Sequence, residues 1–266
     1  MSFEFASKKT ALVIGHPGHE LQVFRFSEII KPIVAVLTDG SGFSGSSRLY
    51  QTQEILSEMG STESSIMGRF TDKTLYQIIF QKDLSQLFHL LDELVEILIT
   101  HEIEVVMGDA IEGFNPTHDL CRYIINNAVR IAEKALNCNI ANFDFPLDAP
   151  PASMDNPPNS DTRSIHLNEE DWNRKYQAAM NYKELAWDIQ NAIGNYGTEI
   201  FRTEFLRPVS HPEKLKAWSG VQPQYELYGR ARVASGKYRD IISFSRHMKP
   251  IGEALWKYTT EVIGQA

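Results

Sequence analysis

Short apolar runs alternate with longer stretches of helical periodicity along the first two thirds of the chain. Runs rich in β-branched residues predict buried strands, and apolar residues spaced three and four apart predict amphipathic helices. The predicted strands cover residues 10–15, 31–40, 64–68, 104–110 and 139–145. The predicted helices cover residues 17–30, 48–59, 84–100, 117–137 and 168–193, with another from residue 249 onwards.

This alternation predicts an α/β fold with a mainly parallel sheet, because parallel strands need crossover connections and helices usually supply them. The stretch 146–163 is rich in Pro, Asn and Asp, so it predicts a linker or a lid-like loop. We expect residues 1–193 to form the core. Residues 194–266 are expected to form a C-terminal extension packed on the same domain.

The composition narrows the classes of function. With 266 residues, 42% of them hydrophobic, the chain can bury a sizeable core. The formal net charge of −8 argues against nucleic-acid binding, which needs clustered Lys and Arg. The two cysteines, Cys121 and Cys138, fit a reducing compartment rather than a disulfide framework. The chain has no secretory signal pattern and no apolar run of the roughly 20 residues that span a bilayer, so we expect a cytoplasmic protein.

Acidic residues and histidines gather in two loops that follow predicted strands. They are His16, His19 and Glu20 after the first strand, and Asp109, Glu112 and His118 after the strand at residues 104–110. Ligands of parallel α/β sheets bind outside the carboxyl ends of the strands, so the two loops can converge at one edge. Three neutral imidazoles meeting there would make a zinc site with its fourth position left for water or substrate. Histidines that cap a helix or lie on the surface are the alternative, and the spacing does not decide between the two.

Several segments resemble motifs of the LmbE-like/PIG-L zinc deacetylase family. The segment ALVIGHPGHE (11–20) is similar to a motif that usually reads A-H-P-D-D-E, and VLTDG (36–40) resembles the family's second strand. Three further matches follow in the family's order: RLYQTQEILSEMG (48–60), DAIEGFNPTHD (109–119) and RKYQAAMNYKEL (174–185). The resemblance covers roughly residues 10–190. It implies a Rossmann-like three-layer sandwich, here with a C-terminal extension.

The resemblance also implies that a zinc ion is held by His16, His19 and His118. His19 stands where the family has an aspartate, and imidazole is an equally good zinc ligand. Fe²⁺ and Mn²⁺ stay open as alternatives, because affinity order alone does not decide which metal a cell loads. The acidic residues that we expect to orient the rings through their N–H groups are Glu20, Asp109 and Asp119.

Two departures from the family concern proton transfer. Gly18 stands where the family has its general-base aspartate, and Asn115 stands where it has a histidine that helps to stabilise the oxyanion. Asn115 can donate a hydrogen bond to an oxyanion, but it cannot act as an acid. Glu112 and Asp39 lie on loops that face the expected cavity and are the candidates for moving the proton. The alternative for each of them is a solvated loop charge or a helix cap.

These features lead to two main hypotheses. The first is a metal-dependent hydrolase that removes an acyl group, such as acetyl, from an amide nitrogen of an N-acetylated sugar or glycoconjugate, with Arg48 contacting the substrate. The sugar rests on the resemblance alone, and an ion pair is the alternative role for Arg48. The second is a relative that binds metal and a carbohydrate or metabolite without deacetylating. A scaffold for protein interaction without metal is a third alternative, and a homo-oligomer stays open.

Overall fold

The computed structural model describes residues 5–42, 45–147, 161–209 and 222–265, and this part of the chain forms a seven-stranded sheet. Its strands are β1 (Thr10–Ile14), β2 (Ile33–Thr38), β3 (Thr62–Phe70), β4 (Val105–Asp109), β5 (Ala141–Phe145), β6 (Arg163–His166) and β7 (Thr203–Pro208). They lie in the order β3-β2-β1-β4-β5-β7-β6. Strands β1 to β5 pair in parallel, whereas β7 is antiparallel to both β5 and β6. The predicted α/β fold with a mainly parallel sheet is confirmed.

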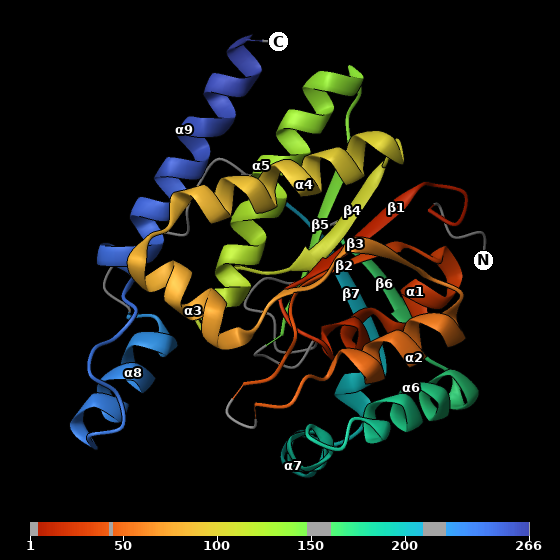
Figure 1. Ribbon diagram of the computed structural model, residues 1–266. Helices are drawn as coiled ribbons and strands as arrows, with labels where there is room; N and C mark the ends of the chain where they lie inside the picture. Colours follow the sequence, from red (N-terminus) through yellow and green to blue (C-terminus); the bar gives the residue numbers. More distant parts are fainter. Residues whose placement is uncertain (1–4, 43–44, 148–160, 210–221, 266) are drawn as a thin grey trace.

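Helices cover both faces of this sheet and make three layers (Figure 1). The helices are α1 (Phe24–Ile30), α2 (Leu49–Met59), α3 (Asp72–Gln81), α4 (Leu84–Thr100), α5 (Pro116–Leu136), α6 (Glu169–Asn181), α7 (Ala186–Tyr196), α8 (Gln224–Ala234) and α9 (Lys249–Gln265). Short 3-10 helices lie at His19–Val23 (η1) and Glu199–Phe201 (η3), and a π-helical turn at Phe244–Met248 (η4) precedes α9. Helices α4, α5 and α9 lie on one face, and α1, α2 and α6 on the other.

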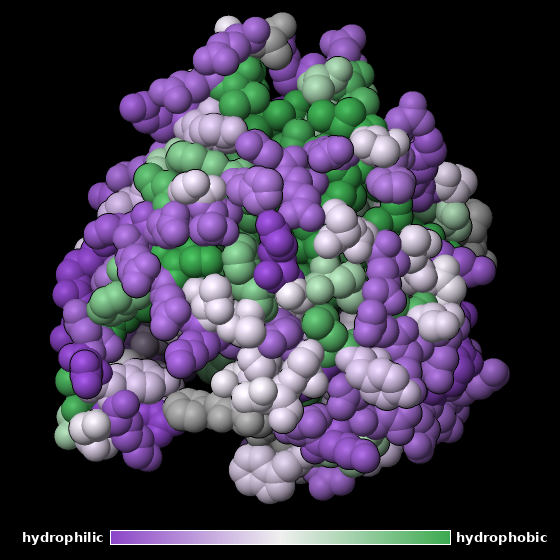
Figure 2. All heavy atoms as spheres, in the orientation of Figure 1, coloured by the Kyte–Doolittle hydropathy of each residue, from purple (hydrophilic) through white to green (hydrophobic). Residues whose placement is uncertain are grey.

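Each face of the sheet has its own hydrophobic core. Successive strand residues point to opposite faces, so β1 contributes Ala11 and Val13 to the core under α4, α5 and α9. Leu12 and Ile14 of the same strand enter the core under α1, α2 and α6. Figure 2 shows mostly hydrophilic side chains over the outer surfaces of the helices in this view, with hydrophobic ones visible between them. Residues buried on both faces explain why the strands read as continuous apolar runs.

Most of the predicted elements are present, and several boundaries agree closely. Helix α2 ends at Met59, and Gly60 follows it with φ +72°, the left-handed conformation in which glycine commonly ends a helix. Helix α4 has the predicted range 84–100. Strand β3 is longer than the predicted segment 64–68.

Two predicted helices differ from the structure, and three elements were not predicted. The segment 17–30 begins with a turn and the 3-10 helix η1 before α1 starts at Phe24. The segment 168–193 is divided into α6 and α7, because the chain leaves the helical conformation at Tyr182. Helices α3 and α8 and strand β6 were not predicted. The loop expected at 146–163 lies mostly outside the described residues.

The strand order creates a crevice at the carboxyl ends of β1 and β4. The chain moves outward from β1 through β2 to β3 and then returns to place β4 on the other side of β1. The connections that follow β1 and β4 therefore run to opposite faces of the sheet, to α1 and to α5, and ligands of doubly wound sheets bind at such a point. Part of the C-terminal region joins the same body, because β7 pairs with β5 and α9 packs against α5. No helix in the described ranges has the length and hydropathy of a bilayer span.

Candidate functional site

Three histidine rings meet at this crevice. His16 lies in the loop after β1, His19 begins η1, and His118 lies in the first turn of α5. The ring centres of His16 lie 5.3 Å from those of both His19 and His118, and the remaining pair is 4.6 Å apart. The loops after β1 and β4 thus converge as the sequence analysis expected.

The turn that carries His16 and His19 is fixed by a buried glutamate. Gly18 has φ +104°, and its backbone N–H donates to Glu20 Oε2 at 2.8 Å. The hydroxyl of Tyr182 donates to the other oxygen of this carboxylate. Burial raises the pKa of Glu20, and the hydrogen bond from Tyr182 opposes that shift. Glu20, which we expected to orient a ring, therefore contacts the backbone of the turn.

Asp109 contacts the ring of His19. Both carboxylate oxygens lie 3.0 Å from His19 Nδ1, and Oδ2 also accepts from the N–H of Gly15 at 2.8 Å. A carboxylate can only accept, so the hydrogen-bond pattern assigns the proton to Nδ1 and leaves the lone pair on Nε2. This is the arrangement expected for Asp109, and it is common around metal-binding histidines. Asp119 differs, because its Oδ1 accepts from the N–H groups of Glu112 and Gly113.

The hydrogen bonds around His16 assign its proton in the same way. Thr38 Oγ1 donates to the carbonyl of Gly15 at 2.9 Å and so accepts from His16 Nδ1 at 2.7 Å. Asp72 Oδ1 lies 3.0 Å from the same nitrogen. Asn115 Oδ1 accepts from the N–H of Thr117 as the cap of α5, which leaves Asn115 Nδ2 facing His16 Nε2 at 3.3 Å. His16 therefore also carries its lone pair on Nε2, which accepts from Asn115 Nδ2.

Asp72 is the site residue that the sequence analysis missed. It is the first residue of α3, and burial alone would raise its pKa. The hydrogen bond and charge of His16 outweigh burial and hold the pKa of Asp72 well below its usual range. Thr71 caps α3 by accepting from the N–H of Thr74. A Thr-Asp pair before an apolar helical pattern was the signal available in the sequence.

The side chain of His118 is almost fully buried, and its Nδ1 has no hydrogen-bond partner in the described part of the chain. Burial, and then the neighbouring rings of His19 and His16, lower the pKa of His118 well below its ordinary value. Burial also lowers the pKa of His16. Leaving such a nitrogen unpaired costs about 1–3 kcal/mol, and a metal ion would satisfy it.

Three imidazole rings at this spacing fit a zinc ion, although their nitrogens do not point at one common position. With Zn–N bonds of about 2.0–2.1 Å at tetrahedral angles, three ring centres would lie about 5 Å apart, as they do here. Among the described residues, however, no group of three or more His, Cys, Asp or Glu side chains is arranged to hold a metal ion. The backbone determines how far apart the ring centres lie, whereas rotation of each side chain determines where its nitrogens point. Metal binding would therefore require at least one ring to turn.

The rings open into a cavity of about 680 Å³ with one polar and one apolar end. At the polar end lie the three histidines with Asp72, Asn115 and Arg48. Aromatic and aliphatic side chains of α6, α7 and η3 form the other end: Trp172, Tyr176, Leu185, Ile189, Ile193, Tyr196 and Phe201.

The two carboxylates expected to move a proton hydrogen bond to backbone instead of lining this cavity. Asp39 Oδ1 accepts from the N–H groups of Ser41 and Asp72. Glu112 Oε2 accepts from the N–H of Leu147 at 2.9 Å. Among the described lining residues, Asp72 is the only carboxylate.

Arg48, the expected substrate contact, lines the cavity above Pro17. Its backbone N–H donates to the carbonyl of Asp39 at 2.8 Å. A Cβ on Gly40 would lie 2.7 Å from Arg48 Nε and 2.9 Å from Pro17 Cδ, so glycine makes room for the guanidinium. Nε is buried and forms no hydrogen bond with any residue that the structure describes.

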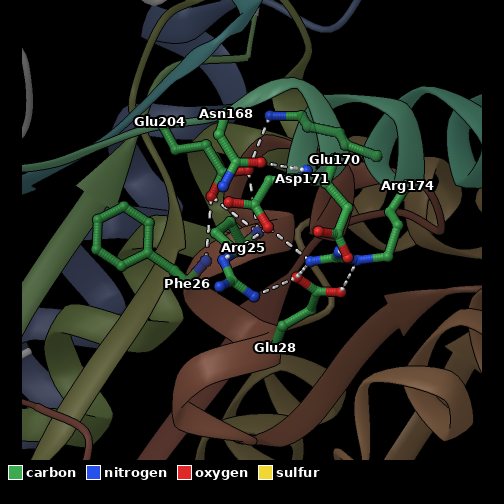
Figure 3. Close-up of polar contacts among 9 residues, drawn as sticks. Arg25, Phe26, Glu28, Asn168, Glu170, Asp171, Arg174 and Glu204 are labelled. Atoms are coloured by element: carbon green, nitrogen blue, oxygen red, sulfur yellow. Dashed lines mark hydrogen bonds and ion pairs between the residues drawn. The ribbon is translucent and has the colours of Figure 1, made fainter.

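A buried carboxylate of β7 anchors the α6 wall of the cavity. Glu204 is fully buried and accepts from the N–H groups of Arg25 and Phe26 at the start of α1. The ammonium group of Lys175, a residue that also lines the cavity, lies 2.9 Å from Glu204 Oε1. Figure 3 shows Glu204 between the two helices. The position of α6 thus depends on a residue that comes late in the chain.

No protein-family model matches this chain, and no curated protein does. Among solved structures, the chain is similar to a triple mutant (Orf2*T) of a deacetylase in the teicoplanin biosynthetic pathway and to the A40926 pseudoaglycone deacetylase Dbv21. Each is 14% identical with a TM-score of 0.47, and the alignments cover 76% of this chain and 99% and 96% of the other two. The zinc-inhibited form of teicoplanin deacetylase Orf2 is 13% identical with a TM-score of 0.43, over 76% of this chain and 99% of that one. Likeness at this level assigns neither a family nor a reaction to this chain.

Proposed function

We propose that this protein is a metal-dependent hydrolase that removes an acyl group from an amide nitrogen. The observation that carries the proposal is the meeting of His16, His19 and His118 in a crevice at the carboxyl ends of β1 and β4. Carboxylates beside Nδ1 of His16 and His19 leave the lone pair of each ring on Nε2, which is the state that a metal ligand needs, and a metal ion would replace the hydrogen bond from Asn115 to His16 Nε2. These three residues would hold the ion after a ring rotation.

Zinc bound there would supply Lewis acidity toward an amide carbonyl and toward water. The chain supplies the remaining parts of the site. Asn115 Nδ2 faces the histidines and can donate to a carbonyl oxygen as negative charge develops on it. Its other amide atom is fixed as the cap of α5, so the donor is held in place before substrate binds.

The substrate class and the metal belong to the same proposal. An N-acylated sugar or glycoconjugate and a zinc ion are what the sequence resemblance supports, with Fe²⁺ or Mn²⁺ as alternatives. Arg48 would contact the substrate, because its guanidinium lines the cavity and its Nε has no hydrogen-bond partner among the described residues. The cytoplasmic location and a homo-oligomer stay predictions.

One observation favours the second hypothesis, a metal-binding relative that does not deacetylate. Asp72 is the only carboxylate among the described cavity residues, and its Oδ1 lies 3.0 Å from His16 Nδ1, where it orients that ring. Asp39 and Glu112 would have to leave their backbone partners before either could take a proton. A site that binds metal and ligand needs no such group, so the two hypotheses differ in turnover and agree in metal binding.

Elemental mass spectrometry of wild type and His19→Ala tests the proposal, with both proteins purified without chelator or histidine tag. About one metal ion per chain in wild type, lost in His19→Ala, would support the three-histidine site, and the same measurement identifies the metal. His89→Ala is the matched control, since His89 is exposed on α4. Absence of metal from wild type would overturn both metal hypotheses. Turnover of a panel of N-acyl amides by the metal-loaded protein then separates hydrolase from binding protein.

A further inference from the structure

Arg122 of α5 is an almost fully buried arginine whose hydrogen-bond acceptors in the described chain are all uncharged. Only 1% of its surface is exposed. Its Nε donates to the carbonyl of Asp109 at 2.5 Å, Nη2 to the carbonyl of Phe143 at 2.9 Å, and Nη1 to Asn142 Oδ1 at 2.8 Å. Burying a guanidinium against uncharged acceptors carries a desolvation cost that an apolar side chain of similar size would avoid. Packing of α5 alone therefore does not explain an arginine at this position.

A glycine of β4 makes room for this guanidinium. A Cβ on Gly108 would lie 2.4 Å from the carbonyl oxygen of Val13 and 3.2 Å from Arg122 Nη2. A larger residue at position 108 would therefore press against β1 on one side and against the guanidinium on the other. Gly108 and Arg122 fit each other, and the fit lets α5 pack close to the end of β4 (Figure 1).

The guanidinium joins the two elements that position His19 and His118. His118 lies one turn before Arg122 on α5, and residues four apart in a helix lie on the same side of it. Asp109, whose backbone carbonyl accepts from Arg122, holds the ring of His19 with both carboxylate oxygens. One side chain thus links the helix that carries His118 to the strand end that holds His19.

We propose that Arg122 is a positioning residue that sets the distance between His19 and His118 by fixing the start of α5 to the end of β4 and to β5. This inference rests on the proposed function, in which these histidines bind a metal ion. Arginine suits the role because its planar fork donates in several fixed directions at once. Arg122 is not among the described residues that line the cavity, so it acts through Asp109 and α5 rather than on a substrate.

His16 is held by a separate set of contacts and serves as an internal reference. Its Nδ1 donates to Thr38 Oγ1 at 2.7 Å and lies 3.0 Å from Asp72 Oδ1, on β2 and α3. The acceptors of Arg122 lie on β4 and β5 instead. Loss of the guanidinium should therefore release the ring of His19 and leave His16 in place, whereas general unfolding would release both rings.

Long-range proton–nitrogen NMR of the metal-free protein tests the inference in Arg122→Met, which keeps an unbranched side chain without donors. At alkaline pH, where imidazoles are neutral, wild type should show His19 with its proton on Nδ1. Arg122→Met should show both tautomers of His19, while His16 keeps its proton on Nδ1. We also expect metal affinity, measured by competition with a chelator, to fall about 10–100-fold. Arg122→Lys should lie between the two, because an ammonium group can reach one carbonyl but lacks the fork.

Ile131→Ala is the matched control, because it removes buried side-chain atoms from the later part of α5 and should lower stability without touching the contacts of Arg122. A single tautomer of His19 in Arg122→Met, with the metal affinity of Ile131→Ala, would overturn the inference. If Arg122→Met does not fold, Arg122→Lys is judged by the same two measurements. Absence of metal from wild type would refute the proposed function, and the tautomers of His19 in the metal-free protein would still decide the role of Arg122.

Discussion

Gly18 holds the turn between His16 and His19 in a conformation that other residues adopt only with strain. Its φ of +104° lies in the left-handed half of conformational space, and a side chain would meet Leu185 Cδ1. We expect Gly18→Asp to lower the free energy of unfolding by about 1–3 kcal/mol. Urea unfolding measures this change. Leu185, which precedes α7, thus occupies the space that a side chain at position 18 would need.

Two further variants separate the clash from the backbone strain. Gly236 has φ +71° with no atom within 4 Å of an added Cβ, so Gly236→Asp carries strain without a clash and should cost less. Leu185→Ala in the Gly18→Asp background should recover part of the loss, beyond the effect of Leu185→Ala alone. Wild-type stability of Gly18→Asp would contradict the expectation and show that the turn relaxes.

Asp72 is expected to control the metal affinity of the site through His16. In Asp72→Asn the ring loses a charged acceptor at Nδ1, although the amide can still accept from the N–H of Gly42. Loss of such an orienting carboxylate typically weakens metal binding about 10–100-fold, which competition with a chelator measures. Asp240→Asn, which removes an exposed ion pair with Arg246, is the control. Unchanged metal affinity in Asp72→Asn would assign Asp72 to the folding of α3 alone.

At the scale of elements, α6 is held against α1 by charges that Figure 3 brings together. Arg174 forms two hydrogen bonds with the carboxylate of Glu28, at 3.0 and 3.1 Å. Glu204 accepts from two N–H groups of α1 and pairs with Lys175 in a buried environment. The exposed part of this network contributes little to stability, whereas the buried pair is sensitive to the loss of one partner.

We expect Glu204→Ala to destabilise the fold by about 3–5 kcal/mol, because Lys175 would keep a buried, unpaired charge. Glu204→Gln should cost less, since its amide oxygen still accepts from the start of α1. Adding Lys175→Met to Glu204→Gln should recover part of the lost stability. Chemical denaturation of wild type, Glu204→Gln, Lys175→Met and the double variant completes a double-mutant cycle. Full additivity of the two single changes would contradict a direct Glu204–Lys175 pair.

Elements with a local sequence pattern could be predicted, and elements that depend on distant contacts could not. Strands β1, β2 and β4 were predictable because they are buried on both faces and read as apolar runs. The break between α6 and α7 was not, because the sequence there has neither Pro nor Gly. Tyr182 ends α6 because its buried hydroxyl contacts Glu20 and Thr52, which lie far away in the sequence. A tertiary contact of this kind leaves no local pattern.

In the candidate site, too, some features follow from the sequence pattern and others depend on contacts in the folded chain. The convergence of the histidines followed from strand-end loops, which topology brings together without knowledge of side chains. The proton-handling candidates did not, because the partners of Asp39 and Glu112 are backbone groups whose positions depend on the folded loops. Asp72 was missed because α3 was not predicted. Without that helix, nothing in the sequence places Asp72 beside the histidines.

At the scale of the whole molecule, the region 194–266 is expected to be part of the same domain as residues 1–193. Without it, β5 would become an exposed sheet edge, and α1 would lose its contact with Glu204. The core under α4 and α5 would also lose Ile251 and Leu255 of α9, both fully buried. Each loss exposes apolar surface or unpaired backbone, and together they exceed the stability that a typical domain has to spare.

We therefore expect residues 1–193 alone to give a collapsed chain without a cooperative transition, whereas deletion of 264–266 should leave unfolding unchanged. Near-ultraviolet circular dichroism and urea unfolding distinguish the two outcomes, because packed aromatic side chains and a steep transition require a closed core. A cooperative transition in the fragment would show that the core folds first and that the C-terminal region docks on it. In that case Glu204 would anchor α6 only after the sheet had formed, and the fragment would keep the histidines and most of the apolar end without the ion pair between Lys175 and Glu204.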